Sequence, residues 1–290
     1  MLICFGLGYS AQHFVEKFGE KFDRIVGTVR DAERAAALNA HPSGRLTALI
    51  FEGSLATPDL RSAIAEADAA LVSVPPDENG DPVLRACGDV LAHAQRLRAI
   101  VYLSTIGVYG DRGGAWVDEA TPPQPGAARS RERLAAEQAW LDFGAGHNIA
   151  VAILRLAGIY GPGQNALVQI ARGSACRIIK PGQVFNRIHV GDIAQAVDAA
   201  FTSRVSGIFN VADDAPTPPA DPIVFAAQLM GVEPPPEIPF EQAAPTMSPM
   251  ALSFWRECRR VKNDKLKREL GVSLRYPTYR EGLRALFEER

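Results

Sequence analysis

Short apolar segments alternate with segments of helical periodicity through the first two thirds of the chain. This alternation is typical of repeated strand–helix units that build a parallel sheet. After the first apolar segment, for example, Ala11, Phe14, Val15 and Phe18 recur at the spacing of one helix face. Seven strands are predicted, at Leu2–Phe5, Arg24–Val29, Leu46–Phe51, Ala69–Val74, Ala99–Ser104, Ala150–Leu156 and Gly207–Val211.

The last third has a different pattern. From Asp213 to Pro249 the chain is rich in Pro, Ala and acidic residues, which predicts irregular structure outside the sheet around one helical stretch at Ile223–Met230. Lys265–Leu270 is predicted to be a helix that ends at Gly271, a typical C-cap, and Tyr279–Phe287 a closing helix. We expect this part to be small and to pack on the carboxyl edge of the sheet as a substrate lid.

Composition and charge narrow the classes of function. The 290 residues are 47% hydrophobic, which is enough for a large core. The net charge is −2 and no run of Lys and Arg is present, so nucleic acid is not an expected partner. The N-terminus does not resemble a secretory signal and no segment is apolar enough to span a bilayer, so we expect a cytoplasmic protein with no membrane partner.

The cysteines do not indicate a metal site or a disulfide. They are far apart in the sequence and form no C-x-x-C motif and no cluster with His. We therefore expect reduced thiols and no metal ligands at Cys4, Cys87, Cys176 and Cys258.

The first strand is followed by a glycine motif. The sequence GLGYSA at residues 6–11 fits G-x-G-x-x-A, directly between a predicted strand and a predicted helix. Gly6 permits the tight turn, Gly8 lets the backbone approach a pyrophosphate, and Ala11 allows close helix–strand packing. The helix N-terminus would supply N–H groups, from Tyr9 and Ser10, and a partial positive charge. The motif predicts a Rossmann-type nicotinamide dinucleotide site, and the alternative is a turn that only closes a strand–helix unit.

The end of the second strand favours NADP over NAD. NAD sites place an Asp or Glu there to hold the ribose 2′-hydroxyl, whereas this segment reads Gly27-Thr28-Val29-Arg30. Arg30 could pair bidentately with a 2′-phosphate, and Thr28 could donate a hydrogen bond to it. Alternatively, Arg30 is a solvated residue at a helix start that pairs with Asp31 or Glu33.

Four further strings occur in order along the chain: YLST with VYG at 102–110, RLAGIYGPG at 155–163, RIHVGDIA at 187–194, and FNVAD at 209–213. Together with the glycine motif they resemble the extended short-chain dehydrogenase/reductase group, the NAD(P)-dependent epimerase/dehydratase family. The resemblance extends from the first strand to the last helix.

The resemblance implies an α/β fold in which a Rossmann-type, doubly wound parallel sheet is joined to a small, interleaved C-terminal lid region. The nicotinamide would lie near the carboxyl ends of the fourth and fifth strands. We expect residues 1–160 to form the dinucleotide-binding core, with 186–212 returning to it. Residues 161–185 and 213–290 would form the substrate-binding region.

The resemblance also implies further site residues. Glu52 and Gly53 would lie near the adenine, and Thr105 takes the position of the family's catalytic Ser or Thr. The other implied cofactor contacts are Ser73, Val74 and Pro75, which pass under the nicotinamide ribose, and Ser104. Glu52 could instead be an exposed carboxylate at a strand end, and the two hydroxyls at 104 and 105 could satisfy local backbone groups.

The chain departs from the family at the Tyr-x-x-x-Lys pair, in which the ammonium lowers the pKa of a phenol that then exchanges a proton beside the nicotinamide. Arg129 stands for the Tyr and Arg133 for the Lys, and residues 110–159 contain neither Tyr nor Lys. A guanidinium cannot exchange a proton usefully near neutral pH, so Arg129 cannot replace the phenol. Arg133 could hydrogen-bond a ribose hydroxyl or a phosphate, or pair with Glu137 on a solvated face.

Four other side chains are positioned as candidates for proton transfer in place of the Tyr: Thr105, Tyr109, Glu132 and His189. None has a strong claim. His189 is better explained as a structural residue at a strand–helix junction, and Tyr109 as packing within its own turn. Asp192 is predicted to be the N-cap of a helix at Ile193–Phe201.

Tyr160 and Asn165 flank the Gly-Pro-Gly loop that borders the substrate in the family, and Arg187 could meet an anionic substrate group there. Alternatively, these three side chains have a purely structural role in packing.

Two functions fit the sequence. One is an oxidoreductase or epimerase/dehydratase-like enzyme that acts with NADP, or alternatively NAD, on a small carbonyl or sugar-like substrate through an altered proton relay. The other is a catalytically silent NADP(H)-binding sensor or regulatory protein, with no substrate. We expect a monomer or a homodimer, because family members often pair through helices that include the one at Arg129–Glu137.

Overall fold

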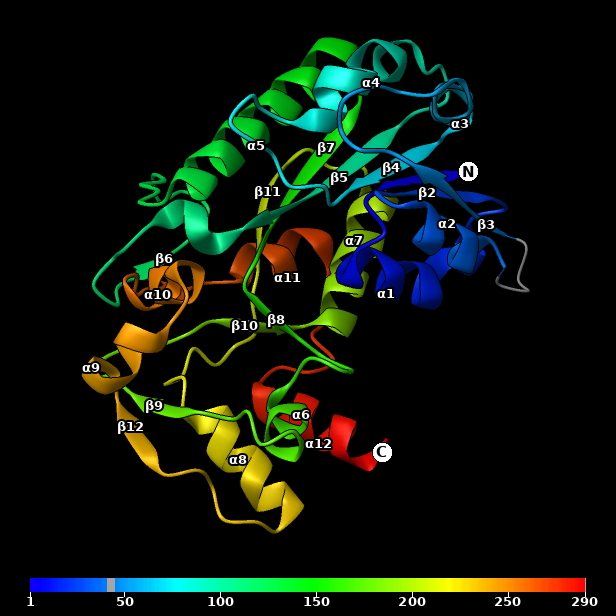
Figure 1. Ribbon diagram of the computed structural model, residues 1–290. Helices are drawn as coiled ribbons and strands as arrows, with labels where there is room; N and C mark the ends of the chain where they lie inside the picture. Colours follow the sequence, from blue (N-terminus) through cyan, green and yellow to red (C-terminus); the bar gives the residue numbers. More distant parts are fainter. Residues whose placement is uncertain (41–44, 290) are drawn as a thin grey trace. The chain divides into compact units, whose positions relative to one another are not determined.

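The computed structural model describes residues 1–40 and 45–289, which form two compact units (Figure 1). The first unit comprises Met1–Thr105, Ala128–Arg155 and Ala194–Phe209. The second comprises Ile106–Ala127, Leu156–Ile193 and Asn210–Arg290. The second unit is about half of the chain rather than a small appendage. The difference from the predicted boundaries arises mainly at Ile106–Ala127, which pairs with a strand near the C-terminus.

A seven-stranded parallel sheet confirms the predicted Rossmann-type α/β fold. The order of its strands is β11-β7-β5-β4-β1-β2-β3. The chain leaves β1 for β2 and β3 on one side and returns to β4 on the other, so the order reverses at β1, where such sheets bind their ligands. The strands agree with their predicted bounds to within two residues: β1 Leu2–Phe5, β2 Ile25–Val29, β3 Leu46–Ile50, β4 Ala69–Val72, β5 Ala99–Thr105, β7 Ala150–Leu156 and β11 Gly207–Val211.

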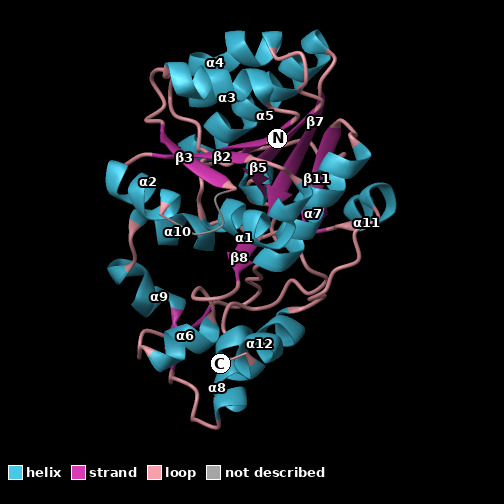
Figure 2. Ribbon diagram, turned by 90° about the vertical axis from the view of Figure 1, so that its right-hand side faces the viewer, coloured by secondary structure: helices cyan, strands magenta, loops and turns pink. Residues whose placement is uncertain are grey.

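Helices cover both faces of this sheet, as a doubly wound fold requires. Figures 1 and 2 show α3, α4 and α5 on one face and α1, α2 and α7 on the other. Caps define several starts: Thr57 and Asp81 accept backbone N–H groups at the starts of α3 and α4, each followed by a proline at the first helical position. The bounds are α1 Tyr9–Phe18, α2 Ala32–Asn39, α3 Pro58–Glu66, α4 Pro82–His93, α5 Ala128–His147 and α7 Val190–Ser203.

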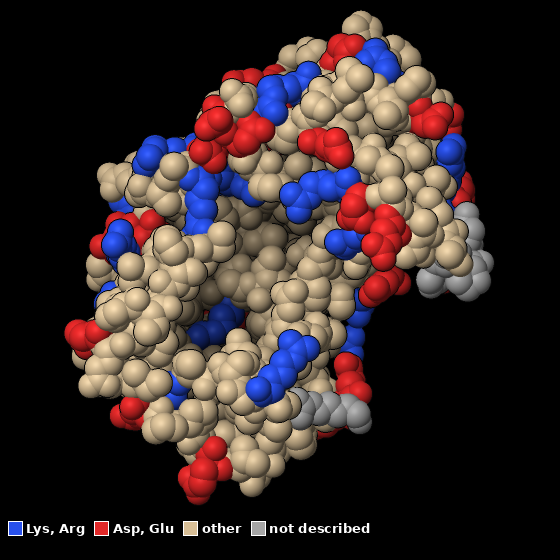
Figure 3. Space-filling view, in the orientation of Figure 1, with Lys and Arg blue, Asp and Glu red and all other residues tan. Residues whose placement is uncertain are grey.

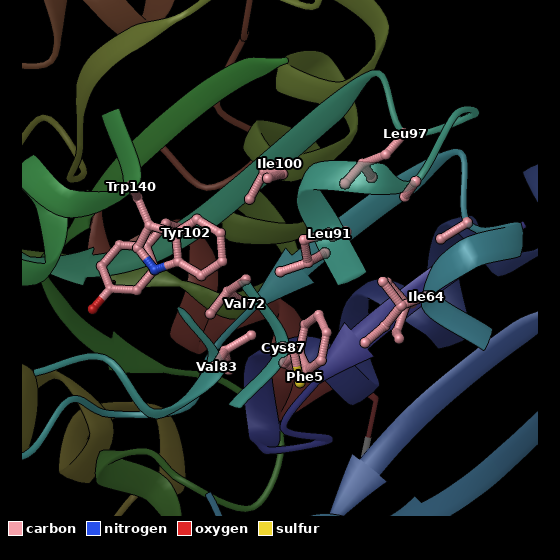
Figure 4. Close-up of a cluster of buried hydrophobic side chains, with 14 of the residues drawn as sticks. Phe5, Ile64, Val72, Val83, Cys87, Leu91, Leu97, Ile100, Tyr102 and Trp140 are labelled. Atoms are coloured by element: carbon pink, nitrogen blue, oxygen red, sulfur yellow. The ribbon is translucent and has the colours of Figure 1, made fainter. Parts of the chain in front are cut away.

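One hydrophobic core of the first unit lies between the sheet and helices α3, α4 and α5 (Figure 4). Trp140 of α5 is fully buried, and its ring centroid lies 6.1 Å from that of Tyr102 on β5. Burial raises the pKa of the Cys87 thiol in this core to about 12, so it is packed as an apolar group. All four cysteines are free thiols.

Three short parallel strand pairs organise the second unit: β6 (Trp116–Val117) with β13 (Arg260–Val261), β8 (Gly158–Tyr160) with β10 (Arg187–His189), and β9 (Arg177–Ile179) with β12 (Glu237–Pro239). The prediction of purely irregular structure around Ile223–Met230 is wrong at β12, because this strand forms only through pairing with a distant segment. The helices are α6 Ala166–Ala171, α8 Asp221–Met230, α9 Phe240–Ala243, α10 Pro249–Trp255, α11 Asp264–Leu270 and α12 Tyr279–Glu288.

A second apolar cluster joins α6, α8 and α12 through residues such as Leu167, Ile223 and Leu283. Gly271 ends α11 with a φ of +65°, as the glycine after that helix predicted. Short 3₁₀ helices at Gly19–Lys21, Ile106–Tyr109 and Ala244–Thr246 complete the described elements.

Basic and acidic side chains are interspersed on the face seen in Figure 3, so neither charge dominates this face. Among the residues that the structure describes, no helix is long and apolar enough to cross a membrane, and no group of three or more His, Cys, Asp or Glu is placed to hold a metal ion.

Candidate functional site

The turn between β1 and α1 has the geometry of a backbone cradle. Gly6 has a φ of +89°, and a Cβ there would lie 3.0 Å from the Ser73 hydroxyl oxygen. Gly8 has an extended backbone (φ −81°, ψ −174°), and a Cβ there would meet no atom within 4 Å. Gly6 is therefore required by the turn itself, whereas Gly8 leaves open space above the backbone.

The N-terminus of α1 lies at this open space. Gly8 is its N-cap, so no side chain caps the helix, and its first turn carries no acidic residue. The first four N–H groups of a helix have no intrahelical acceptor and carry a partial positive charge. This arrangement, with the N–H groups of Tyr9 and Ser10 in the first turn, suits a pyrophosphate.

Strand β2 holds the turn in place. The Gly6 N–H donates to the Thr28 hydroxyl (2.9 Å), and the Leu7 N–H donates to the Thr28 carbonyl (2.8 Å). The Leu7 side chain fits over Gly27, where a Cβ would lie only 2.2 Å from a Leu7 methyl carbon. Thr28 is 1% exposed, so its side chain is built into the turn, while Arg30 is exposed two residues later.

A second guanidinium, which the sequence analysis missed, lies on the turn. Asp31 caps α2 and accepts the Arg34 N–H (2.8 Å), and Nη2 of Arg34 donates to the Leu7 carbonyl (2.7 Å). Neither Asp31 nor Glu33 forms an ion pair with Arg30 in the described part of the chain. The available signal was a second arginine four residues after Arg30 in the sequence.

The segment after β4 contacts the same turn. The Ser73 hydroxyl donates to the Gly6 carbonyl (2.5 Å), Val74 is half-buried beside Gly6, and Pro75 is exposed. The structure therefore brings Ser73 and Val74 against the glycine motif, with Pro75 next to them in the sequence. After β3, Glu52 is exposed and Gly53 has a φ of +91°.

Ser104 belongs to a buried polar cluster. It is 5% exposed, and its hydroxyl donates to the Glu137 carboxylate of α5. Arg155 of β7 donates to the same carboxylate through Nε (3.1 Å) and Nη2 (2.7 Å), and both charged side chains are at most 2% exposed. The Ser104 hydroxyl is thus directed to a buried ion pair.

Arg133 lies one turn before Glu137 on α5, but it does not pair with Glu137. Its Nη1 donates to the Tyr102 hydroxyl (2.9 Å) and to the Leu103 carbonyl (3.1 Å). The alternative of a solvated Arg133–Glu137 ion pair is therefore wrong, because Glu137 is buried and pairs with Arg155. Arg129 is exposed in the first turn of α5, and Thr105 is half-buried at the end of β5.

The three predicted substrate residues lie in the second unit. Asn165 is the N-cap of α6: its Oδ1 accepts the Val168 N–H (3.0 Å) and its Nδ2 donates to the Gly161 carbonyl (2.8 Å). Tyr160 is 8% exposed and donates to the Thr278 carbonyl (3.3 Å), and its burial raises its pKa.

Arg187 is held by the segment that follows β11. Its Nη1 donates to the Thr217 hydroxyl (2.8 Å) and to the Phe185 carbonyl (3.1 Å). Burial lowers the pKa of Arg187, and the Asp213 carboxyl opposes that shift. The guanidinium thus sits in a preformed, partly desolvated position.

Two of the remaining predictions need correction. The Tyr109 hydroxyl donates to Oδ1 of Asn210 (2.8 Å), so Tyr109 packs against a distant segment rather than within its own turn. Helix α7 begins at Val190, so Asp192 is not its N-cap; its carboxylate accepts the N–H groups of Arg275 (2.7 Å) and Tyr276 (3.1 Å). His189 accepts the Gly191 N–H at the strand–helix junction, as its structural interpretation requires.

Comparison with known proteins finds a family model and several relatives that are similar to this chain. The model for the NAD dependent epimerase/dehydratase family matches residues 81–212. A functionally unknown conserved protein from Silicibacter pomeroyi is 45% identical, with a TM-score of 0.87 over 99% of this chain and 98% of that one. The middle of the chain therefore resembles the NAD dependent epimerase/dehydratase family, and the whole chain resembles the Silicibacter pomeroyi protein. The family match spans α4 to β11 and so includes the residues around Ser104, Arg133 and Arg187, whereas the glycine turn precedes it.

Two curated relatives match a smaller part of this chain. Protein YeeZ from Escherichia coli K12 is 32% identical over 185 residues, which are 60% of this chain and 63% of YeeZ. A 3-diazoavenalumate denitrifying reductase from a Streptomyces species is 28% identical over 207 residues, 66% of each chain. The chain therefore matches just under two thirds of the length of these relatives.

The buried Glu137–Arg155 pair yields a stability prediction. Glu137→Leu should lower the free energy of unfolding by about 3–5 kcal/mol, because it leaves the Arg155 charge buried without its partner. The double variant Glu137→Leu/Arg155→Met should recover much of this loss, since no buried charge remains. Urea unfolding followed by circular dichroism measures both.

The control is the Lys21–Asp198 pair, whose side chains are 54% and 21% exposed. Asp198→Asn should cost less than about 1 kcal/mol. A Glu137→Leu variant as stable as this control would contradict the importance of the buried pair.

Proposed function

We propose that this chain is an NADP(H)-binding oxidoreductase or epimerase/dehydratase-like enzyme that acts on a small carbonyl or sugar-like substrate. The observation that carries the proposal is the turn above Gly8, where an uncapped helix N-terminus opens onto free space. A dinucleotide pyrophosphate would accept N–H groups of the first turn of α1, where the N-cap Gly8 supplies no side-chain acceptor. The match of residues 81–212 to the NAD dependent epimerase/dehydratase family model supports a nicotinamide cofactor.

The preference for NADP rests on charge at the end of β2. This strand ends without an acidic residue and is followed by Arg30, while Arg34 is anchored to the Leu7 carbonyl through one of its five N–H donors. The two exposed guanidiniums would hold the 2′-phosphate of NADP. In NAD sites, by contrast, the Asp or Glu at this position would repel the charge of such a phosphate. Glu52, Ser73, Val74 and Pro75 complete the proposed contacts to the cofactor.

The proposed proton relay differs from that of the family. We align Arg129 and Arg133 with the family's Tyr and Lys, and a guanidinium supplies no exchangeable proton near neutral pH. Arg133 is instead the proposed positioning residue: its Nη1 donates to Tyr102 and Leu103, and its other N–H groups would donate to a ribose hydroxyl. Thr105 remains the proposed hydroxyl beside the reacting carbonyl.

On the substrate side, the proposed contacts are Tyr160, Asn165 and Arg187, of which Arg187 would meet an anionic group. Reduction is the half-reaction favoured, because one relative is named a reductase. The chemistry that the nicotinamide supplies when bound is hydride transfer.

A second function is favoured by one observation, namely that Arg133 is committed to Tyr102 and Leu103 where the family carries its acid–base pair. On this alternative the protein binds NADP(H) without catalysis and reports the redox state of the cofactor. Oxidised and reduced cofactor would then bind with different affinities and change the oligomeric state or a partner interaction.

Gly8→Asp tests the pyrophosphate position. Asp is a favoured N-cap and stabilises a helix N-terminus, so the melting temperature should stay the same or rise. The affinity for NADP(H) should fall by about 100-fold, because the carboxylate takes the same N–H groups and repels the phosphates. Gly8→Asn, which has the same size without the charge, should lose less. Unchanged calorimetric affinity of a folded Gly8→Asp variant would contradict the proposed position.

Arg30→Ala and Arg34→Ala test the 2′-phosphate. Each should weaken NADP and NADPH by about 10- to 100-fold, since a charge-assisted hydrogen bond contributes about 1.5–3 kcal/mol, and leave NAD and NADH nearly unchanged. Arg61→Ala, which removes an exposed guanidinium paired with Asp89 on another helix, is the control. Equal losses for all four nucleotides, or none, would refute the NADP preference.

Catalysis is tested by the consumption of NADPH with a panel of carbonyl compounds and nucleotide sugars. We expect turnover above the buffer blank with at least one compound, and Thr105→Ala should reduce it without changing cofactor affinity. Silence across the panel, with NADPH shown by calorimetry to be bound, would favour the sensor. Equal binding of NADP and NADPH with no change of oligomeric state would then remove the sensor as well.

A further inference from the structure

Strand β5 holds one end of the Arg133 guanidinium. The Nη1 of Arg133 donates to the Tyr102 hydroxyl (2.9 Å) and to the Leu103 carbonyl (3.1 Å). The guanidinium carbon also lies 5.4 Å from the centre of the Tyr102 ring, within the range of a cation–π contact. Two consecutive residues of β5 thus restrain both the position of Nη1 and the plane of the guanidinium.

The opposite edge of this guanidinium remains available. Nε and Nη2 of Arg133 donate to no group in the part of the chain that the structure describes. Arg133 is half-buried, and neither of these nitrogens is both buried and unpaired, so solvent reaches them. The Nε–H and Nη2–H groups are two parallel donors in a rigid fork, which matches a pair of neighbouring oxygen atoms. Such a fork binds both oxygens only when its plane is fixed.

Tyr102 supplies a fixed acceptor for that purpose. Its side chain is fully buried, and its ring centroid lies 6.1 Å from that of Trp140. In Figure 4 its hydroxyl points away from the other labelled core side chains. Burial raises the pKa of Tyr102, and the Arg133 guanidinium opposes this shift. The hydroxyl is therefore neutral near neutral pH, and the packed ring holds it in one place.

The identity of residue 133 explains why such an acceptor is needed. A lysine, which the family has at this position, carries three donors on a rotatable nitrogen, whereas the donors of a planar guanidinium must be aimed. We propose that Tyr102 is a positioning residue that acts through Arg133: it directs the Nε–Nη2 edge toward the two hydroxyls of the nicotinamide ribose. This inference rests on the proposed function, because it requires the cofactor. Tyr102 itself is fully buried and does not touch the cofactor.

The alternative is that Arg133 only satisfies a buried phenol, as buried tyrosines usually require. Two ligands separate the alternatives. NADPH contains the nicotinamide ribose, whereas adenosine 2′,5′-bisphosphate has the adenine and the 2′-phosphate but lacks that ribose. The ratio of their dissociation constants therefore reports on the nicotinamide half of the cofactor, while a general loss of structure weakens both ligands.

Tyr102→Phe removes only the hydroxyl. In calorimetry this variant should bind NADPH about 3- to 10-fold more weakly, the effect of one net hydrogen bond, with the affinity for the bisphosphate unchanged. Arg133→Ala should weaken NADPH about 10- to 100-fold. Because Tyr102 acts through Arg133, the double variant Tyr102→Phe/Arg133→Ala should bind NADPH no more weakly than Arg133→Ala alone.

Ile100→Val is the matched control. Ile100 is fully buried on the same strand and in the same core as Tyr102, and it forms no contact with the guanidinium that the proposal uses. Loss of one buried methyl group should lower the melting temperature. The ratio of the two dissociation constants should stay at its wild-type value. Melting temperatures also establish that each of the other variants is folded.

Three outcomes would overturn the inference. An unchanged ratio in a folded Tyr102→Phe variant would leave Tyr102 as a core residue only. An equal change of the ratio in Ile100→Val would assign the effect to stability, and additive losses in the double variant would show that Tyr102 does not act through Arg133. In these three cases the wild-type chain still binds NADPH and the proposed function stands. Absence of NADPH binding to the wild-type chain would instead refute the proposed function, and this inference with it.

Discussion

The candidate cofactor site depends on how closely the turn after β1 approaches β2. Gly27 has no side chain, so Leu7 can occupy the space above it, and the Thr28 hydroxyl accepts the Gly6 N–H that the turn would otherwise bury unsatisfied. These contacts fix the backbone that leads into α1. A larger residue at position 27 would push Leu7 outward and move the N-terminus of α1 with it. The geometry of the proposed phosphate site is therefore set by β2 as much as by the glycine motif.

Much of the sheet could be predicted from the sequence, because each strand is a local apolar segment whose burial needs no knowledge of its partner. The seven strands and the ends of α11 and α12 follow from such local patterns. The strand β12 could not be predicted, since its three residues become a strand only beside β9. The division into units failed at 106–127 for the same reason: this segment is fixed by pairing with residues near the C-terminus.

The candidate site shows the same limit more sharply. Glycines and a helix start are visible in a sequence, whereas the direction of a long polar side chain is not. Arg133 and Glu137 have the spacing of a surface ion pair, yet one reaches Tyr102 and the other is buried on Arg155. Arg34 was missed because its partner is a backbone carbonyl in another element. In the sequence, Asp213 is visible only as part of the motif FNVAD. Its burial, which raises its pKa, arises only in the folded chain.

The missing cap on α1 has a consequence for the unliganded protein. A helix with Gly rather than Ser or Asp at its N-cap gives up a few tenths of a kcal/mol of stability, and here the acidic side chains that would favour the first turn are absent as well. An anion in this position acts as the cap that the polypeptide lacks. On the proposed function, the bound pyrophosphate supplies this cap, and the resistance of this end of the molecule to heat and to proteolysis then rises with the nucleotide concentration.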